Sequence, residues 1–123
     1  MQRQRGELPA AEASLQAAIA VLQDAARHDP GHAGYQNNLA ACYGDLAEVQ
    51  RGRGDLAGAE ASRRAALAIA ERNLERDPEN AVLLDQLAGC YHRLRLVQGE
   101  RGDLRGAQAT LKALRAVEQR RTR

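Results

Sequence analysis

The 123-residue sequence contains no Trp, no Phe and only three Tyr. A folded core must therefore be built from aliphatic side chains, and much of the 44% apolar content is Ala. β-branched residues, which favour strands, are scarce, whereas Ala is the best helix former. The composition therefore predicts an all-α protein that is long enough for one domain with a modest core.

Serine and threonine are nearly absent from the sequence, with four residues in total. None of the four has a His and an acidic residue nearby, so nucleophilic catalysis has no support. The glycine-containing turns lack the preceding strand and the following Lys-Ser/Thr of a phosphate-binding loop. We therefore predict no catalytic residues and no cofactor, and hence a protein that is not an enzyme. The four hydroxyl-bearing residues are Ser14, Ser62, Thr110 and Thr122.

Cysteine and histidine are also too sparse to predict a metal site. Cys42 and Cys90 each fall on an apolar helix stripe, which predicts small buried thiols rather than a disulfide or metal ligands. His28 and His32 have the spacing of two ligands on one helix, but Pro30 lies between them and breaks the helix. Because no Cys or acidic residue stands at ligand spacing, we expect no zinc site.

The sequence has no apolar run of about 20 residues, so no membrane span is predicted. Residues 1–7 are polar and no apolar run follows them, so no secretory signal is predicted. The 18 basic and 16 acidic residues are interspersed, and a net charge of +2 does not imply a nucleic-acid partner. The Arg-rich end, residues 115–123, is expected to be a solvated helix end with a frayed tail. These absences favour a cytoplasmic protein without membrane or nucleic-acid partners.

The sequence does contain a repeat with a period of 48 residues. Three copies begin at Gly6, Gly54 and Gly102, and 20 of 48 positions are identical between residues 6–53 and 54–101. The identities fall at the turn glycine, the Ala-rich helix, the Asp-Pro pair and the apolar positions of the next helix. A fixed period of this length predicts stacked structural units rather than one globular core.

Apolar residues at helical spacing predict five helices joined by short connections. Pro30 and Pro78 end the first and third helices, and glycine-containing turns end the second and fourth. Asp29 and Asp55 are predicted to cap the helices that follow them. Helices are predicted at residues 8–28, 31–51, 55–76, 79–98 and 103–119.

The predicted helices alternate between two types. Helices 31–51 and 79–98 form the first type, and the other three form the second type. Gln2 matches Gln50 and Gln98, so residues 1–5 are expected to be the last turn of a first-type helix ended by Gly6. The apolar stripes of the first type are predicted at Tyr35, Leu39, Cys42, Leu46 and Val49, and at Leu83, Leu87, Cys90, Leu94 and Val97. Those of the second type are predicted at Leu8, Ala11, Leu15, Ala18, Ile19, Leu22 and Ala26, at Leu56, Ala59, Ala66, Leu67, Ala70 and Leu74, and at Leu104, Ala107, Leu111, Leu114 and Val117.

Particular slots in each unit have a spacing that resembles the tetratricopeptide repeat family. The slots of the first-type helices hold Tyr43, Leu46-Ala47 and Gln50, and then Tyr91, Leu94-Arg95 and Gln98. The slots of the second-type helices hold Ala11, Leu15 and Ala18, then Ala59, Arg63 and Ala66, and then Ala107, Leu111 and Leu114. Pro30 and Pro78 occupy the closing proline slot. The resemblance covers almost the whole chain.

The chain departs from the family pattern in the length of its unit and at one apolar slot. The usual unit has about 34 residues, and the additional residues lengthen each helix by about two turns without rotating its apolar face. Arg63 stands where a large buried residue is expected, and we expect its side chain to extend along the helix or the packing there to be looser. Long units of this kind resemble the repeats beside bacterial signalling domains.

The resemblance implies a short right-handed solenoid of antiparallel helix hairpins, occupying residues 1–123 as a single domain. It also implies that the first-type helices line a concave face where a protein or peptide partner binds. Asp45 and Arg93 hold equivalent positions on this face and are expected to pair with each other. No convincing copy of the family's carboxylate clamp is present. The expected lining residues are Asn37, Asn38, Asp45, Glu48, Arg51, Asp85, Gln86, His92, Arg93, Leu96 and Glu100.

The predicted function is therefore that of a non-catalytic protein–protein interaction scaffold that binds a peptide or helix in a shallow groove. Two alternatives remain open. The array begins and ends with a second-type helix and has no predicted polar capping helix, so apolar faces open at both ends would let copies of the chain form a homo-oligomer. The second alternative is that the chain is a fragment of a larger bacterial signalling protein.

Overall fold

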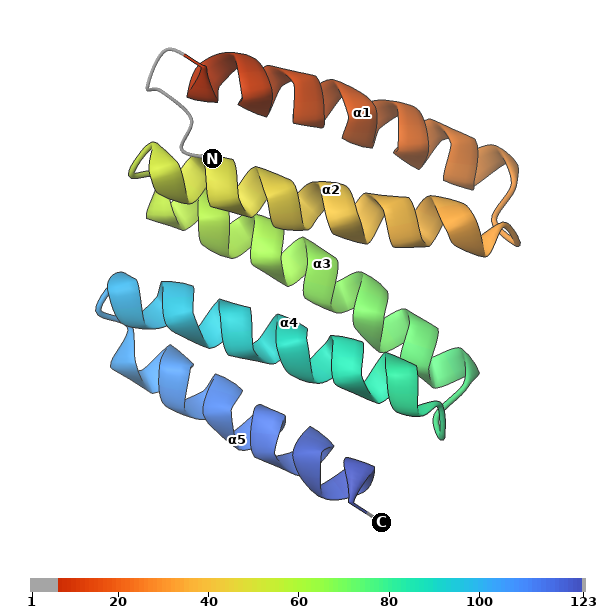
Figure 1. Ribbon diagram of the computed structural model, residues 1–123, viewed down its shortest axis with the longest axis vertical. Coiled ribbons are helices and arrows are strands. Elements are labelled where there is room, and N and C mark those ends of the chain that lie inside the picture. Colours follow the sequence, from red (N-terminus) through yellow and green to blue (C-terminus); the bar gives the residue numbers. More distant parts are fainter. Residues whose placement is uncertain (1–6, 123) are drawn as a thin grey trace. The chain divides into compact units, whose positions relative to one another are not determined.

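A computed structural model describes residues 7–122, which form five α-helices and contain no β-strand (Figure 1). The prediction of an all-α protein is confirmed. The expected turn at Gln2 to Gly6 and the last residue, Arg123, lie outside the described residues. The helices are α1 (Leu8–His28), α2 (Ala33–Gly52), α3 (Leu56–Arg76), α4 (Ala81–Glu100) and α5 (Leu104–Arg121).

The starts of α2 and α4 lie two residues later than expected because neither helix is capped by the residue before the proline. Asn80 caps α4, and its side-chain oxygen accepts hydrogen bonds from the backbone N–H groups of Val82 and Leu83. His32 occupies the N-cap of α2 without a side-chain cap. The prediction that Asp29 caps α2 is wrong, since its own N–H donates to Ala25 and it ends α1. A capping side chain reaches only the N–H groups two or three residues ahead, and the turn places those groups before the helix.

The turns between α2 and α3 and between α4 and α5 have the same construction. Gly54 and Gly102 adopt positive φ angles of 82° and 78°, a conformation that glycine adopts without steric cost. The next residue in each turn is an Asp whose Oδ1 accepts a hydrogen bond from the backbone N–H three residues later, at 2.9 Å in both copies. The predicted helix cap at Asp55 is therefore confirmed.

Each of these turns is also closed by a buried hydrogen bond between side chains, here called a Gln–hydroxyl pair. The Ser62 hydroxyl donates to Oε1 of Gln50 at 2.6 Å, and the Thr110 hydroxyl donates to Oε1 of Gln98 at 2.6 Å. All four residues are buried, and Gln98 is only 1% exposed. The pair ties the end of a first-type helix to the second turn of the helix that follows.

The glutamine side chain lies directly against the start of the second helix in both copies. A Cβ added at Gly58 or Gly106 would stand 2.2 or 2.1 Å from Oδ2 of the capping Asp55 or Asp103, and 2.9 Å from the amide nitrogen of Gln50 or Gln98. The backbone carbonyl of each glutamine also accepts a hydrogen bond from the capping Asp. The repeated glycine at this position is therefore explained by close approach rather than by an unusual backbone angle.

The chain divides into two compact units, residues 1–66 and 67–123. In the first unit α1 packs along α2, and the buried apolar side chains come from all of its helical segments. The Leu and Val residues predicted on the α2 stripe are buried, whereas Tyr35 and Cys42 are half-buried. The buried apolar residues of this unit are Leu8, Ile19, Leu39, Leu46, Ala47, Val49, Ala59 and Ala66.

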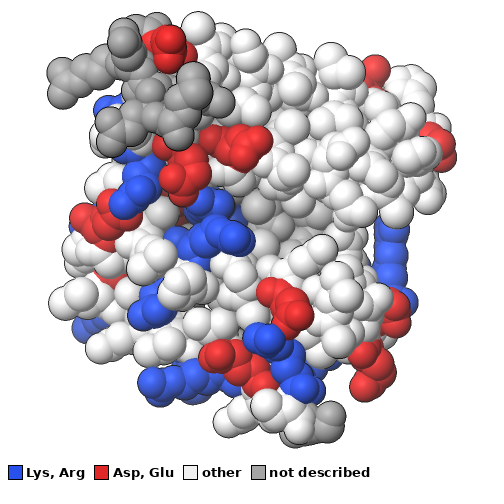
Figure 2. Space-filling view, in the orientation of Figure 1, with Lys and Arg blue, Asp and Glu red and all other residues white. Residues whose placement is uncertain are grey.

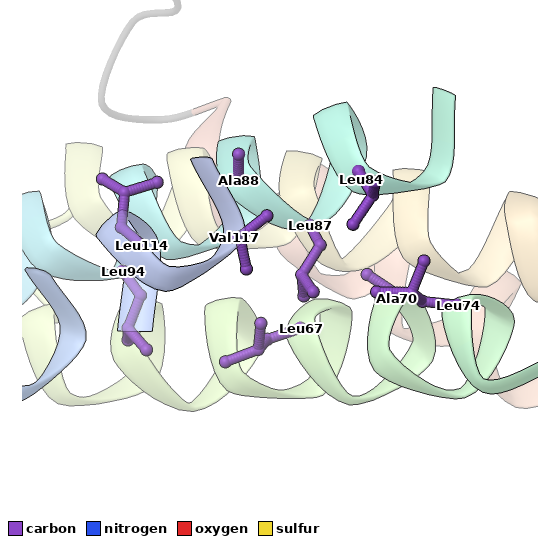
Figure 3. Close-up of a cluster of buried hydrophobic side chains, with 9 residues drawn as sticks. All are labelled: Leu67, Ala70, Leu74, Leu84, Leu87, Ala88, Leu94, Leu114 and Val117. Atoms are coloured by element: carbon purple, nitrogen blue, oxygen red, sulfur yellow. The ribbon is translucent and has the colours of Figure 1, made fainter. Parts of the chain in front are cut away.

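In the second unit α4 packs along α5 over the C-terminal part of α3 (Figure 3). The buried side chains are mostly Leu, and Cys90, Tyr91 and Leu111 pack against them half-buried. Most of these residues belong to the predicted stripes. The cluster consists of Leu67, Ala70, Leu74, Leu84, Leu87, Ala88, Leu94, Leu114 and Val117.

The half of α5 that corresponds to the core face of α3 is polar. The face of α3 that carries the buried residues Leu67, Ala70 and Leu74 has its counterpart on α5 at Arg115, Glu118 and Thr122. All three of these polar residues are exposed. This half of α5 therefore lacks the apolar residues that α3 places in the core of the second unit.

Leu104 is the apolar exception on α5, and its predicted burial is wrong, since it is 70% exposed. Its counterpart Leu8 is buried, and a Cβ added at Gly52 would stand 3.5 Å from Leu8 Cδ1. The first-turn leucine is therefore covered by the end of the first-type helix that follows it. No helix follows α5 within the described residues.

The Gln–hydroxyl pairs predict a specific pattern of stability changes. Thr110→Val and Ser62→Ala should each lower the free energy of unfolding by about 1–3 kcal/mol, because each leaves a buried glutamine carbonyl without its donor. The matched control is Ser14→Ala, which removes the equivalent but exposed hydroxyl of α1 and should change stability by no more than about 0.5 kcal/mol. Urea unfolding followed by circular dichroism measures all three, and equal losses for all three variants would contradict the assignment.

Candidate functional site

The predicted lining residues of α2 form an exposed polar stripe on the first unit. Asn37, Asn38, Asp45, Glu48 and Arg51 are all exposed, whereas Leu39, Leu46 and Val49 on the opposite stripe are buried. The helical period thus separates the two stripes as expected. Along α2 this surface carries two neutral amides, then two acidic side chains and then one basic side chain.

Glu48 is already engaged by two arginines within the first unit. Its Oε1 lies 2.5 Å from Nη2 of Arg63 on α3, and its Oε2 lies 4.0 Å from Nη1 of Arg51. The Arg63 side chain is only 11% exposed, and its Nε is buried without a hydrogen-bond partner. The sequence analysis expected Arg63 to extend along its own helix or to lie in looser packing, whereas its guanidinium reaches the Glu48 carboxylate on α2. A partner that needs Glu48 must compete with this ion pair.

The predicted lining residues of α4 form the corresponding exposed stripe on the second unit. Leu96 is 50% exposed, and it gives this stripe an apolar contact that α2 lacks. Asp85 pairs with Arg121 of α5 at 2.5 Å, a partner that the sequence analysis did not identify. The remaining exposed residues of this stripe are Gln86, His92, Arg93 and Glu100.

One hydrogen bond, from Arg95 to His92, and the close approach of Arg93 to Gly89 define the middle of the α4 stripe. The Arg95 guanidinium donates to Nδ1 of His92 at 3.3 Å, while Nε of Arg95 is buried without a partner. A Cβ added at Gly89 would stand 3.2 Å from Nη1 of Arg93, so the Arg93 side chain lies back over the helix. The stripe therefore presents cationic groups beside Leu96. Because Asp45 and Arg93 belong to different units, their pairing stays a prediction.

Neither cysteine is part of a disulfide, and both are half-buried rather than buried. The predicted burial is wrong in degree. The longer neighbours Leu46, Leu87 and Leu94 fill the centres of the two units, and the short thiols stand at the margin.

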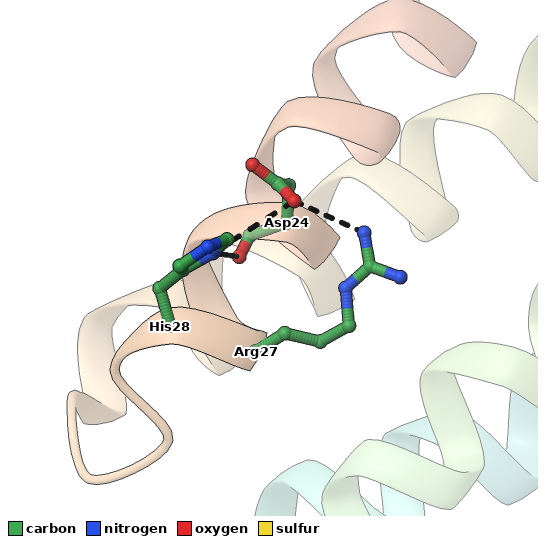
Figure 4. Close-up of polar contacts among 3 residues, drawn as sticks. All are labelled: Asp24, Arg27 and His28. Atoms are coloured by element: carbon green, nitrogen blue, oxygen red, sulfur yellow. Dashed lines mark hydrogen bonds and ion pairs between the residues drawn. The ribbon is translucent and has the colours of Figure 1, made fainter.

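The two histidines with ligand spacing have separate partners. Nδ1 of His28 lies 2.8 Å from the backbone carbonyl oxygen of Asp24 and 3.8 Å from its carboxylate, which Arg27 also contacts at 3.0 Å (Figure 4). His32 stacks on Tyr35 with ring centroids 4.2 Å apart. Within residues 7–122 no group of three or more His, Cys, Asp or Glu is arranged to hold a metal ion.

The Arg-rich end of α5 is more ordered than expected. Nη2 of Arg120 donates to the backbone carbonyl of Pro78 at 2.9 Å, and Arg121 forms the ion pair with Asp85. The expectation of a frayed tail from Arg120 is therefore wrong, because both side chains bond to the start of the same hairpin. These two guanidinium groups also have partners already, which weakens the case for a phosphate-binding surface.

Tyr91 is the residue whose titration the fold changes. Its side chain packs half-buried against the core of the second unit, and burial raises the pKa of its phenol. Negative charge on Glu71 and on Cys90 adds to the increase in the pKa. The phenol therefore stays neutral at physiological pH.

A surface hollow of about 570 Å³ is lined by Leu8, Arg51, Gly52, Arg53 and Gly54, and it includes only Arg51 of the predicted lining residues. No helix among residues 7–122 has the length and apolar character to cross a membrane.

Comparison of the chain with models of known protein families, with curated proteins and with solved structures finds no match. The likeness to tetratricopeptide repeats therefore rests on the slots in the sequence and is not supported by a relative.

Replacement of Arg63 tests the ion pair that crosses the first unit. Arg63→Leu, which introduces the residue found in the equivalent slots of α1 and α5, should raise the free energy of unfolding by about 1 kcal/mol, because it removes an unsatisfied buried Nε. Glu48→Gln should lower it by about 1–2 kcal/mol, because it removes the charged partner. In the Arg63→Leu background the Glu48→Gln change should have no effect. A full effect of Glu48→Gln in that background would contradict the assignment.

The raised pKa of Tyr91 predicts a loss of stability at alkaline pH. The folded state holds the phenol proton more tightly than the unfolded state, so its contribution to stability is present below the ordinary pKa of 10.0. That contribution is lost as the pH rises through the higher pKa of the folded state. Absorbance titration of a variant with Tyr35 and Tyr43 replaced by Phe should show Tyr91 ionising above pH 10 in the folded chain and near it in urea. Identical midpoints would contradict the prediction.

Proposed function

We propose that this chain is a non-catalytic protein–protein interaction scaffold of the tetratricopeptide-like class, which binds a peptide or a helix through the outward stripes of α2 and α4. Stacking of its hairpins as a right-handed solenoid, the arrangement that the resemblance implies, is part of the proposal. A cytoplasmic location and origin within a bacterial signalling protein belong to it as well.

The observation that carries the proposal is that all eleven predicted lining residues are exposed, while apolar residues on the opposite stripes of the same helices are buried. The side chains of this surface are therefore not needed to fill the cores of the two units, and they stay accessible to solvent. Some of these residues already have partners within the chain: Glu48 and Asp85 each form an ion pair with a second-type helix, Arg51 lies near Glu48, and His92 accepts a hydrogen bond from Arg95. The residues available to a partner are therefore chiefly amides, His92, Arg93 and Leu96.

The composition of the α4 stripe indicates the chemistry of the partner. Arg93 and Arg95 place positive charge beside His92, and Leu96 adds an apolar contact of moderate size. Arginine beside an exposed apolar residue is typical of the centre of a protein interface. We therefore propose a peptide ligand with an acidic residue next to an apolar residue.

Selection of peptides from a display library against the whole chain tests this function. Selected peptides should bind Arg93→Glu and Leu96→Asp at least about tenfold more weakly, because both changes fall at the centre of the proposed contact. The control Lys112→Glu, an equal change of charge on an exposed residue of α5, should leave the affinity within about twofold. Peptides that bind all three variants equally would contradict the proposal.

A further inference from the structure

Two acidic residues of the outward stripes are neutralised within their own units. The Glu48 carboxylate of α2 contacts the Arg63 guanidinium, and the Asp85 carboxylate of α4 contacts the Arg121 guanidinium. Figure 2 shows basic and acidic side chains interspersed on the face that it draws, with no large area of one sign. Recognition by charge on these stripes therefore depends on single residues without a partner, rather than on a broad field of one sign.

Asp45 on α2 and Arg93 on α4 are two such residues. Both are exposed, and neither forms an ion pair among the described residues of its own unit. They hold equivalent positions, 48 residues apart in the repeat, yet their charges are opposite. A Cβ added at Gly89 would stand 3.2 Å from Nη1 of Arg93, so the guanidinium lies back over Gly89. An acidic side chain that approached α4 at this glycine would therefore meet the guanidinium directly.

The apolar residues beside these two charges are complementary in size. On α2 the exposed Ala41 lies one turn before Asp45. On α4 Leu96, which is 50% exposed, lies three residues after Arg93. When two such helices run antiparallel, the residues before Asp45 face the residues after Arg93. Leu96 would then lie on the small Ala41, whereas a parallel pair would place it beside the charged Glu48.

We propose that the α2 stripe of one copy of this chain binds the α4 stripe of a second copy, with the two helices antiparallel. Asp45 of one copy would pair with Arg93 of the other, and Leu96 would pack on Ala41. Both stripes advance in steps of three and four residues, which is the spacing of a seam between two packed helices. The proposal rests on the proposed function, because it keeps the same stripes as the binding surface and names a second copy as their partner.

A second copy is favoured over another polypeptide because α2 carries what the α4 stripe requires. The α4 stripe presents a cation beside an exposed leucine, and α2 presents an acidic residue beside an exposed alanine that leaves room for the leucine. The contact involves the first unit of one copy and the second unit of the other. It therefore needs no particular placement of the two units within one chain.

Reversal of the two charges in separate variants tests this contact. Sedimentation equilibrium of the whole chain over a concentration series should show a mass that rises above that of one chain. Asp45→Arg and Arg93→Asp should each raise the dissociation constant at least about tenfold, because each brings like charges together. An equimolar mixture of the two variants should associate as the original chain does, because every contact between the different variants joins opposite charges.

Matched controls use exposed polar residues of α5. Glu118→Arg and Arg115→Asp make the same reversals of charge and should leave the dissociation constant within about twofold. Ala41→Leu should raise the dissociation constant about tenfold, because it fills the room that Leu96 would occupy. Circular dichroism of each variant checks that substitution of an exposed residue leaves the helices folded.

Three outcomes would overturn the proposal. The first is the mass of one chain at every concentration, a result that leaves the proposed function standing if selected peptides respond to Arg93→Glu and Leu96→Asp. The second is self-association that neither charge reversal weakens, which would place the contact on another surface. The third is a mixture of the two variants that associates no better than either alone, as expected if Asp45 and Arg93 pair within one chain or contact a different polypeptide.

Discussion

A buried hydroxyl that donates to a buried glutamine carbonyl sets the geometry on which the hairpins of this protein depend. The bond joins Gln50 to Ser62 in one unit and Gln98 to Thr110 in the other, at 2.6 Å in both. It joins the end of the first helix of the turn to the second turn of the helix that follows. The capping Asp carboxylate and the glutamine amide together occupy the space that a Cβ at Gly58 or Gly106 would need. Packing of small aliphatic side chains, without Phe or Trp, specifies the relative position of two helices only weakly. A directional hydrogen bond between buried polar groups adds that specificity.

The repeat also explains why the two terminal helices differ. On α5 the positions equivalent to Leu67, Ala70 and Leu74 hold polar, exposed residues. On α1 Val21 is exposed, whereas its counterparts Ile69 and Val117 are buried. Helices that share the repeat pattern therefore differ in the character and exposure of equivalent positions.

Much of the fold follows from local signals in the sequence. The helix ends predicted from Pro30, Pro78 and the turn glycines lie close to those in the structure, because these residues act through the backbone alone. Predictions that depended on neighbouring helices were weaker. Leu104 is exposed because no helix covers it within the described residues. Arg63 has a partner on α2, the Glu48 carboxylate, which helical spacing alone does not identify.

The Gln–hydroxyl pairs were not predicted from the sequence, although their residues repeat at an interval of 48 residues. Each glutamine and its hydroxyl partner lie twelve residues apart on two different helices, so only the packing of the turn brings their side chains together. A double-mutant cycle tests the central claim most directly. Gln98→Leu with Thr110→Val, and Gln50→Leu with Ser62→Ala, should each show a coupling energy of about 1–2 kcal/mol, and the crossed combination Gln50→Leu with Thr110→Val about zero. Coupling that is absent from both pairs, or equal in the crossed combination, would contradict the account.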